Sequence, residues 1–247
     1  MIGKLVSIEE ARARVLAEAA PLPVEEQAID ECLGQALAED VVAPHAVPPF
    51  DNSGMDGYAV KAADTVEASP ESPAVLMVQE TLAAGQVAQG VLEPGHAVKI
   101  MTGAPLPAGA DAVVQVEATA EHEGQVQVFQ PVRPGRNVRQ AGEDVRAGDV
   151  VLRAGDVLGP AEIGVLASLG FPRAKVHRRP RVAVVSTGSE LVEVDKPLGP
   201  GQIRNSNGHT LIALCRQLGA VVTGLGIVPD DYAATRKFLE EGLRYDV

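Results

Sequence analysis

The chain has 247 residues, of which 46% are hydrophobic and 22% charged, and its formal net charge is -12. This length is enough for one large or two modest domains with real cores. Nucleic-acid-binding proteins need a basic face, and anionic membranes attract basic segments, so the acidic balance argues against both classes. A local pocket can still bind an anionic small molecule, because pocket charge and net charge are independent.

The cysteines and the apolar runs indicate a cellular compartment. Cys32 and Cys215 form no CxxC or zinc pattern, so we expect two reduced, buried thiols. No apolar run approaches the roughly 18 residues of a membrane span. The first 15 residues turn acidic early and do not read as a secretory signal. We therefore expect a cytoplasmic protein that binds neither membrane nor nucleic acid.

The first segment reads as helical. Ser7 and Glu10 have the spacing of a capping box, and Pro21 and Pro23 follow the periodic residues and should end the helix. A second short helix is predicted over residues 30–39, where Leu residues recur at helical spacing.

The region from about 41 to 151 changes to short apolar runs separated by Gly, Pro, Asp and Asn, which is typical of a compact β-rich unit. Two similar phrases, 146–151 and 153–158, predict neighbouring strands with similar turns. The clearest predicted strands are 74–78, 97–101, 112–116 and 125–129.

A further helix is predicted to begin at Pro160 and to stop at Gly170. Residues 177–181 follow as a basic hinge, which we interpret as a solvated linker. Alternating strand and helix patterns then predict a parallel α/β sheet. Its elements are strand 181–186, helix 207–218, strand 221–227 and a helix capped by Asp230 or Asp231 that runs to about 243.

The last three residues, 245–247, resemble the start of a third strand. A sheet that stopped there would leave an unpaired edge, so we expect the chain to be a fragment or a truncated product. The fold class is therefore α+β and multidomain. The predicted layers are a helical linker layer (1–44 and 151–178), an inserted β-rich domain (45–150) and an incomplete α/β parallel-sheet domain (179–247).

Two turns of the β-rich region are candidates for chemistry. Asp56 lies in a dense Pro, Gly, Asp and Asn stretch, although Asp56-Gly57 alone would be an ordinary hairpin turn. Thr102 precedes Gly103, and together they could bind an anion, or Thr102 could simply close a turn.

Arginines form a third candidate. Arg133, Arg136 and Arg139 precede Glu143 and Asp144 in a loop rich in Pro and Gly. Such a group could clamp oxyanions or could form a surface ion-pair cluster.

The carboxyl ends of the two parallel strands are the fourth candidate, because open α/β sheets bind ligands there. Ser186, Thr187 and backbone amides near Gly188 could hold a phosphate, and Glu190 could bind a divalent cation. Asp230 ends the second strand and should lie on the same rim, which would make a natural Mg²⁺ arrangement. The residues fit neither a P-loop nor GxGxxG.

Several phrases in order resemble the molybdopterin molybdenumtransferase family, whose animal relative is the C-terminal domain of gephyrin. They run over nearly the whole chain: PPFDNSGMDGYAV, KIMTGAPLPAGADAVV, NVRQAGEDVRAGDVVL, PAEIGVLASLG, RVAVVSTGSELV, GQIRNSN and GIVPDD.

The resemblance implies the last step of molybdenum cofactor synthesis. Family members take adenylylated molybdopterin and molybdate, use Mg²⁺ or a similar divalent cation, and release AMP and the metal-loaded cofactor. The resemblance also implies an elongated homodimer with a site shared between subunits, and a molybdopterin adenylyltransferase as upstream partner.

Carried over by position, Asp56 and Thr102 would face the partner's pocket, and Asp144 matches the acid of the GED phrase. Glu190 and Asp230 match the rim acids and would bind the metal. The resemblance further implies a pterin-binding loop and a C-terminal barrel beyond residue 247, so we expect this chain alone to bind molybdopterin poorly. Two alternatives remain: a truncated inactive product, and a scaffold protein that kept the fold.

Overall fold

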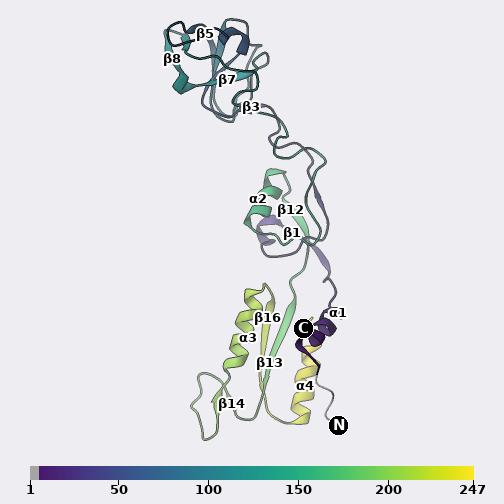
Figure 1. Cartoon of the computed structure of the whole chain (residues 1–247). Helices are drawn as coiled ribbons and strands as arrows, with labels where there is room; N and C mark the ends of the chain where they lie inside the picture. The colour runs from purple at the N-terminus through teal and green to yellow at the C-terminus, as the bar shows by residue number, and fades with distance from the viewer. Residues whose placement is uncertain (1–5) are drawn as a thin grey trace. The chain divides into compact units, whose positions relative to one another are not determined.

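A computed structural model describes residues 6–247. The chain divides into two compact units. One is Val41–Val151, and the other combines the segment ending at Asp40 with Leu152–Val247. Figure 1 shows both units coloured along the chain, and each is described separately below.

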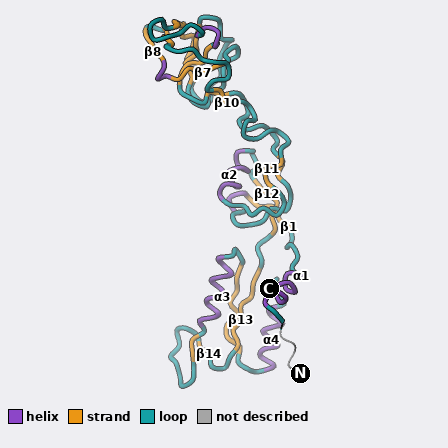
Figure 2. The backbone as a smooth tube through the Cα atoms, viewed as in Figure 1, coloured by secondary structure: helices purple, strands orange, loops and turns teal. Residues whose placement is uncertain are grey.

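The unit Val41–Val151 is built almost entirely of strands and loops (Figure 2). Its main sheet has six strands in the order β7-β4-β6-β5-β9-β8, all antiparallel except the parallel pair β5 and β6. All four predicted strands are confirmed. The strands are β2 (Val41–Val42), β3 (Asn52–Ser53), β4 (Gly57–Val60), β5 (Ala74–Leu82), β6 (His96–Ile100), β7 (Ala112–Gln115), β8 (Thr119–His122), β9 (Gln125–Val128), β10 (Val138–Arg139) and β11 (Val150–Leu152), whose last residue belongs to the other unit.

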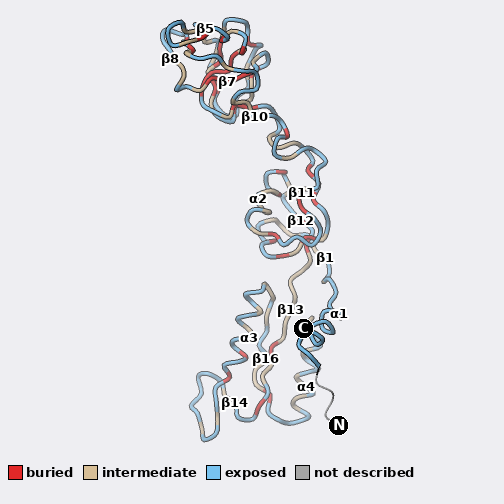
Figure 3. The backbone as a smooth tube through the Cα atoms, viewed as in Figure 1, coloured by how far each residue is buried: buried red, intermediate tan, exposed pale blue. Residues whose placement is uncertain are grey.

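The strands β4, β6 and β7 of the sheet are buried on both faces, whereas β9 alternates exposed and buried residues. Along β4, Tyr58 and Val60 join one apolar cluster while Ala59 joins the other, because successive side chains of a strand point to opposite faces. Figure 3 shows many buried positions on these strands. Val, Ala and Leu supply most of this core, as the scarcity of aromatic residues requires.

A polar contact links the last strand of the sheet back to its first half. Glu121 on β8 accepts hydrogen bonds from the Tyr58 hydroxyl and from Lys99 Nζ, both at 2.6 Å. The burial of Tyr58 raises the pKa of its hydroxyl, and the bond to Glu121 raises it further. Since β8 and β4 stand far apart in the strand order, the sheet must curl to allow this contact.

The other unit starts with α1 (Ile8–Ala17), which Ser7 caps by accepting the Glu10 amide at 3.1 Å. The chain continues through β1 (Val24–Ala28) and a 3-10 turn, η1 (Ile29–Glu31). The predicted helix over 30–39 is therefore wrong. Gly34 adopts φ +78°, and the following residues extend to bridge distant strands, with Leu37 opposite Val176.

The predicted helical linker layer needs a second correction. The helix α2 (Pro160–Ser168) begins and ends as predicted, with Gly170 at φ +80° after it. However, β1 pairs antiparallel with β12 (Arg173–His177), so a two-stranded ladder joins the two chain segments of this layer. The two similar phrases form similar turns, capped by Asp149 and Asp156, but they do not pair with each other as neighbouring strands.

The α/β prediction is confirmed in its element types. The strands β13 (Arg181–Thr187) and β16 (Val221–Val228) pair in parallel, and α3 (Ser206–Gln217) and α4 (Tyr232–Gly242) follow them. Asp231 caps α4 by accepting the Ala234 amide at 2.8 Å. A short parallel pair, β14 (Leu191–Val192) and β15 (Ile203–Arg204), was not predicted.

The basic hinge is not a solvated linker. Both terminal nitrogens of Arg178 donate to Asp246 at 2.6 Å, and Arg179 donates to the carbonyl of Leu33 at 2.7 Å. The Arg178 guanidinium holds the pKa of the Asp246 carboxyl well below its usual range. Residues 245–247 run beside β13, with the Val247 carbonyl accepting the Ala183 amide at 2.8 Å, although they are not assigned as a strand.

Within residues 6–247, no helix is both long enough and apolar enough to cross a membrane.

Candidate functional site

Asp56 and Thr102 meet at one end of the curled sheet. Both the amide and the hydroxyl of Thr102 donate to Asp56 Oδ1 at 2.7 Å. These two bonds hold the pKa of Asp56 below its ordinary value, and the bond from the backbone amide contributes most to the shift. The contact follows from strand register, because Gly57 on β4 pairs with Ile100 on β6. Both residues are exposed, so the ionised carboxylate is open to a ligand.

Gly57 makes this arrangement possible. A Cβ at this position would lie 2.0 Å from the carbonyl oxygen of Val114 on β7, so no side chain fits there. The glycine thus lets β4 and β7 approach closely immediately after Asp56.

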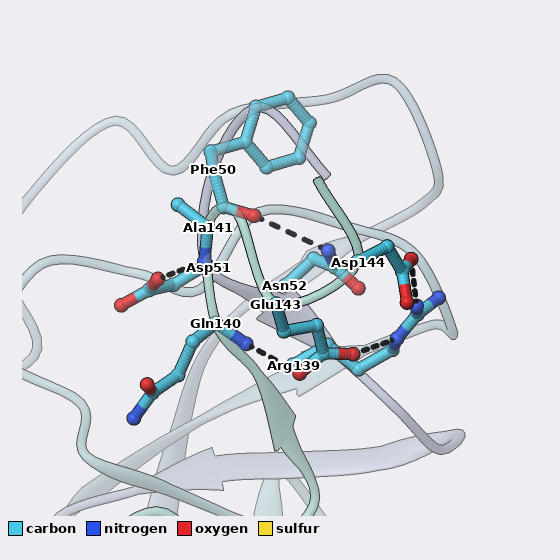
Figure 4. Close-up of polar contacts among 8 residues, drawn as sticks. All are labelled: Phe50, Asp51, Asn52, Arg139, Gln140, Ala141, Glu143 and Asp144. Carbon is cyan, nitrogen blue, oxygen red and sulfur yellow. Dashed lines mark hydrogen bonds and ion pairs between the residues drawn. The ribbon is translucent and has the colours of Figure 1, made fainter. Parts of the chain in front are cut away.

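Asp144 is held by an arginine rather than left free. Arg139 donates from Nε to Glu143 at 2.5 Å and from a terminal nitrogen to Asp144 at 2.7 Å (Figure 4). The Gln140 amide also donates to Glu143 at 3.1 Å. Of the two interpretations of this arginine-rich loop, the ion-pair cluster is confirmed for Arg139. The predicted substrate-binding residue Asp144 is thus already paired in this structure.

Figure 4 also shows how the same loop is fixed to the DNSGMDG turn. The amide of Ala141 donates to Asp51 Oδ1 at 2.8 Å, and the Asn52 side chain donates to the Phe50 carbonyl at 3.2 Å. The strands β3 and β10 pair between them, with Asn52 opposite Arg139. Two phrases that lie far apart in sequence therefore form one surface.

Ser186 and Thr187 end β13 beside the start of α3. They line a pocket of about 210 Å³ together with residues 205–207. The Ser186 hydroxyl donates to Asn205 Oδ1 at 2.8 Å, and the same oxygen accepts the Gly208 amide at 3.0 Å and so caps α3. A helix N-terminus carries partial positive charge, so this pocket suits an anionic group.

Asn205 is a residue that the sequence-based prediction missed. It is 6% exposed and connects the strand end to the helix start. A signal was present, since Asn is a favoured cap and stands just before the predicted helix.

Glu190 and Asp230 lie on the same rim, as predicted. The Ser189 amide donates to Asp230 Oδ2, and the Asp230 amide donates to Ser189 Oγ, both at 3.1 Å. Glu190 follows Ser189 directly, and its carboxylate lies over Gly188, where a Cβ would be 2.6 Å from Glu190 Oε2. Gly188 also lines a neighbouring pocket of about 380 Å³ with Ser189.

The donor set of this rim is small. Among residues 6–247, no group of three or more His, Cys, Asp or Glu side chains is placed to hold a metal ion. Mg²⁺ usually keeps several waters and binds one or two carboxylates plus substrate phosphates. The exposed pair Glu190 and Asp230 fits that pattern but does not fit a closed, all-protein metal cage.

The predicted site residues therefore fall into two groups, each in its own unit. Asp56, Thr102 and Asp144 belong to the unit Val41–Val151. Ser186, Thr187, Gly188, Glu190 and Asp230 belong to the other.

Two family profiles match the chain, and together they include both groups of predicted site residues. The family profile described as MoeA N-terminal region (domain I and II) matches residues 6–170. The chain belongs to the molybdopterin molybdenumtransferase (MoeA) family. A second profile, described as a probable molybdopterin binding domain, matches residues 183–247 of this MoeA family member.

Relatives within the MoeA family are moderately similar in sequence. Molybdopterin molybdenumtransferase 2 of Mycobacterium tuberculosis (strain H37Rv) is 46% identical over 205 residues, which cover 83% of this chain and 51% of the relative. The molybdopterin molybdenumtransferase of Staphylococcus aureus (strain N315) is 37% identical over 243 residues, covering 98% of this chain and 58% of the relative. The chain thus spans about half the length of these curated relatives.

A solved MoeA structure shares the fold. The molybdopterin biosynthesis moeA protein from Pyrococcus horikoshii OT3 superposes with a TM-score of 0.89 at 35% identity. The superposition covers 98% of this chain and 64% of that chain.

Proposed function

We propose that this chain acts in molybdenum cofactor biosynthesis, as part of a transferase that inserts molybdenum from molybdate into adenylylated molybdopterin and releases AMP. The observation that carries the proposal is the pair of family matches, in order, over residues 6–170 and 183–247. Relatives named molybdopterin molybdenumtransferase support it at 46% and 37% identity.

The rim of the α/β unit suits the phosphate end of such a substrate. Ser186, Thr187 and the start of α3 form the pocket for an anionic group. Glu190 and Asp230 would hold a divalent cation such as Mg²⁺, which would neutralise charge that develops on the phosphates. The bonds between Ser189 and Asp230 fix the second of these carboxylates before any ligand binds.

Asp56 and Thr102 would complete the site from the partner subunit of a homodimer. Because Thr102 orients the Asp56 carboxylate and keeps it ionised, this pair suits a polar or cationic group of the substrate complex. A molybdopterin adenylyltransferase would supply the substrate.

The proposed activity is tested by incubating a full-length transferase that contains this chain with adenylylated molybdopterin, molybdate and Mg²⁺. AMP release is measured by chromatography, and cofactor formation by reconstitution of a molybdenum-dependent apoenzyme. We expect Glu190→Gln and Asp230→Asn to abolish both readouts, with Glu241→Gln, an exposed glutamate of α4, as a matched surface control. Full activity in Glu190→Gln would refute the assigned role of the rim.

Mixing variants tests whether the site is shared. If Asp56 and Glu190 act in one site built from two subunits, Asp56→Asn and Glu190→Gln are each inactive, but their mixture regains activity. A mixed dimer then contains one intact site. Continued inactivity of a mixture that demonstrably exchanges subunits would contradict a shared site while leaving the reaction itself untested by this measurement.

A further inference from the structure

The arginines of the loop before β10 separate into two kinds. Arg139 is neutralised by Glu143 and Asp144, whereas Arg133 and Arg136 have no carboxylate partner within 4.0 Å in the described part of the chain. Both residues line a pocket of about 370 Å³ in the unit Val41–Val151. Two unpaired guanidinium groups in one pocket contrast with the net charge of -12 of the whole chain.

The other polar residues of this arginine pocket carry amide side chains. Gln115, Gln130 and Asn137 line it, and no Asp or Glu does. Guanidinium groups bind phosphate oxygens through paired N–H donors, and amides complement them with further donors and acceptors.

The outer edge of β7 also lines the pocket, through Val113, Val114 and Gln115. This strand is the first of the six-stranded sheet, and its Val113 amide donates to the Arg136 carbonyl at 3.0 Å. Asn137 Nδ2 donates to the Val113 carbonyl at 2.9 Å. Since backbone groups alternate between the two edges of a strand, Gln115 also turns its amide and carbonyl toward this edge.

The loop that carries the arginines is held at both ends. The Val132 amide donates to the fully buried Thr65 hydroxyl at 3.1 Å, and the Gly135 amide donates to the Asp111 carbonyl at 2.7 Å. Pro131 and Pro134 further restrict the backbone. A loop ordered in advance loses less conformational entropy when a ligand binds.

From these observations we infer that the arginine pocket binds the phosphate group of a small molecule. The two guanidinium groups match the charge of a phosphate dianion. A volume of about 370 Å³ lies in the range of small-molecule pockets and leaves room beyond the phosphate for an attached group. The inference is independent of the proposed function, because every residue it uses lies within Val41–Val151.

The test is a titration of the isotope-labelled full chain followed by backbone amide NMR, with three probes: AMP, inorganic phosphate and adenosine. We expect saturable shifts with AMP at Gln115 and at the non-proline residues of 130–137, and none with adenosine. Tighter binding of AMP than of phosphate would assign the pocket to a phosphate ester, and equal binding would assign it to free phosphate.

Variants supply the control. The double change Arg133→Gln and Arg136→Gln should weaken AMP binding at least tenfold, while Arg146→Gln, an exposed arginine elsewhere in the unit, should leave it unchanged. Both arginines of the pocket are exposed, so the double variant should fold, which its unperturbed spectrum would verify. The inference is overturned if neither phosphate nor AMP shifts these amides, or if the double variant binds AMP as the unchanged chain does.

Discussion

Replacing Asn205 by Ala should destabilise the α/β part of the chain, because one side-chain oxygen serves two donors. Asn205 Oδ1 accepts the Gly208 amide at the start of α3 and the Ser186 hydroxyl at the end of β13. Alanine removes both bonds at a position that is 6% exposed. Water cannot easily replace the lost acceptor at such a position.

The size of the effect follows from the two bonds. Loss of a helix N-cap to Ala costs about 1 kcal/mol. Loss of the bond from the partly buried Ser186 hydroxyl costs about 1 kcal/mol more. A total of about 2 kcal/mol corresponds to a fall in melting temperature of roughly 4–8 °C for a protein of this size.

The assay is thermal unfolding followed by circular dichroism at neutral pH. Asn205→Asp is the matched variant, since it keeps the acceptor oxygen and adds negative charge at the start of α3, where such charge is favourable. Asn207→Ala is a second control, because it removes an exposed amide from the same helical turn. An unchanged melting temperature in Asn205→Ala, or an equal fall in Asn205→Asp, would refute the reasoning.

Three further predictions address other parts of the chain. Gly57→Ala should strongly destabilise the β-rich unit, because its Cβ would lie 2.0 Å from the Val114 carbonyl oxygen. Gly90→Ala is the control and should be tolerated, and denaturant unfolding measures the stability of both variants. Thr102→Val should raise the pKa of Asp56 toward its ordinary value without restoring it fully, since the backbone amide still donates; an NMR titration of the carboxyl carbon would show no change if the hydroxyl were irrelevant. The lowered pKa of Asp246 contributes stability above about pH 4 that is lost as pH falls toward its folded value. The stability difference between the unchanged chain and Asp246→Asn should therefore shrink on acidification, and a constant difference from pH 7 to acid would contradict this.

Features with a local chemical cause were predictable from the sequence. Asp231 caps α4 and Gly170 follows α2 because capping and left-handed backbone depend on the residue itself and its near neighbours. Short apolar runs and the residues that end them likewise predicted the alternation of strand and helix in β13, α3, β16 and α4.

Features that depend on distant partners were not predictable in the same way. Residues 30–39 carry Leu at helical spacing, but Leu37 bridges Val176, which lies far along the chain. The basic hinge looked solvated because its partner, Asp246, is 68 residues from Arg178. The bond between Asp56 and Thr102 spans 46 residues and exists only because of the register of β4 on β6.

The predicted site acids Asp56, Asp230 and Asp144 differ in the hydrogen-bond donors that their carboxylate groups already bind. Thr102 occupies one oxygen of Asp56, and Ser189 occupies one oxygen of Asp230; in both cases the donors are neutral. Asp144 instead pairs with the guanidinium of Arg139, which it shares with Glu143, so its charge is partly offset.

Because of this difference, we expect acids that looked equivalent in sequence to interact with a substrate in different ways. A carboxylate oriented by neutral donors keeps its full negative charge, so we expect Asp56 and Asp230 to be available to a cation or a positively charged group. Asp144 can engage a substrate only if Arg139 moves or binds the substrate as well. An anionic substrate would favour the second route, because it could take the place of Asp144 on the guanidinium. We therefore expect Arg139→Gln to weaken binding of an anionic substrate more than Asp144→Asn does, as measured by the ratio of their KM values. The opposite order would show that Asp144, rather than its arginine, makes the contact.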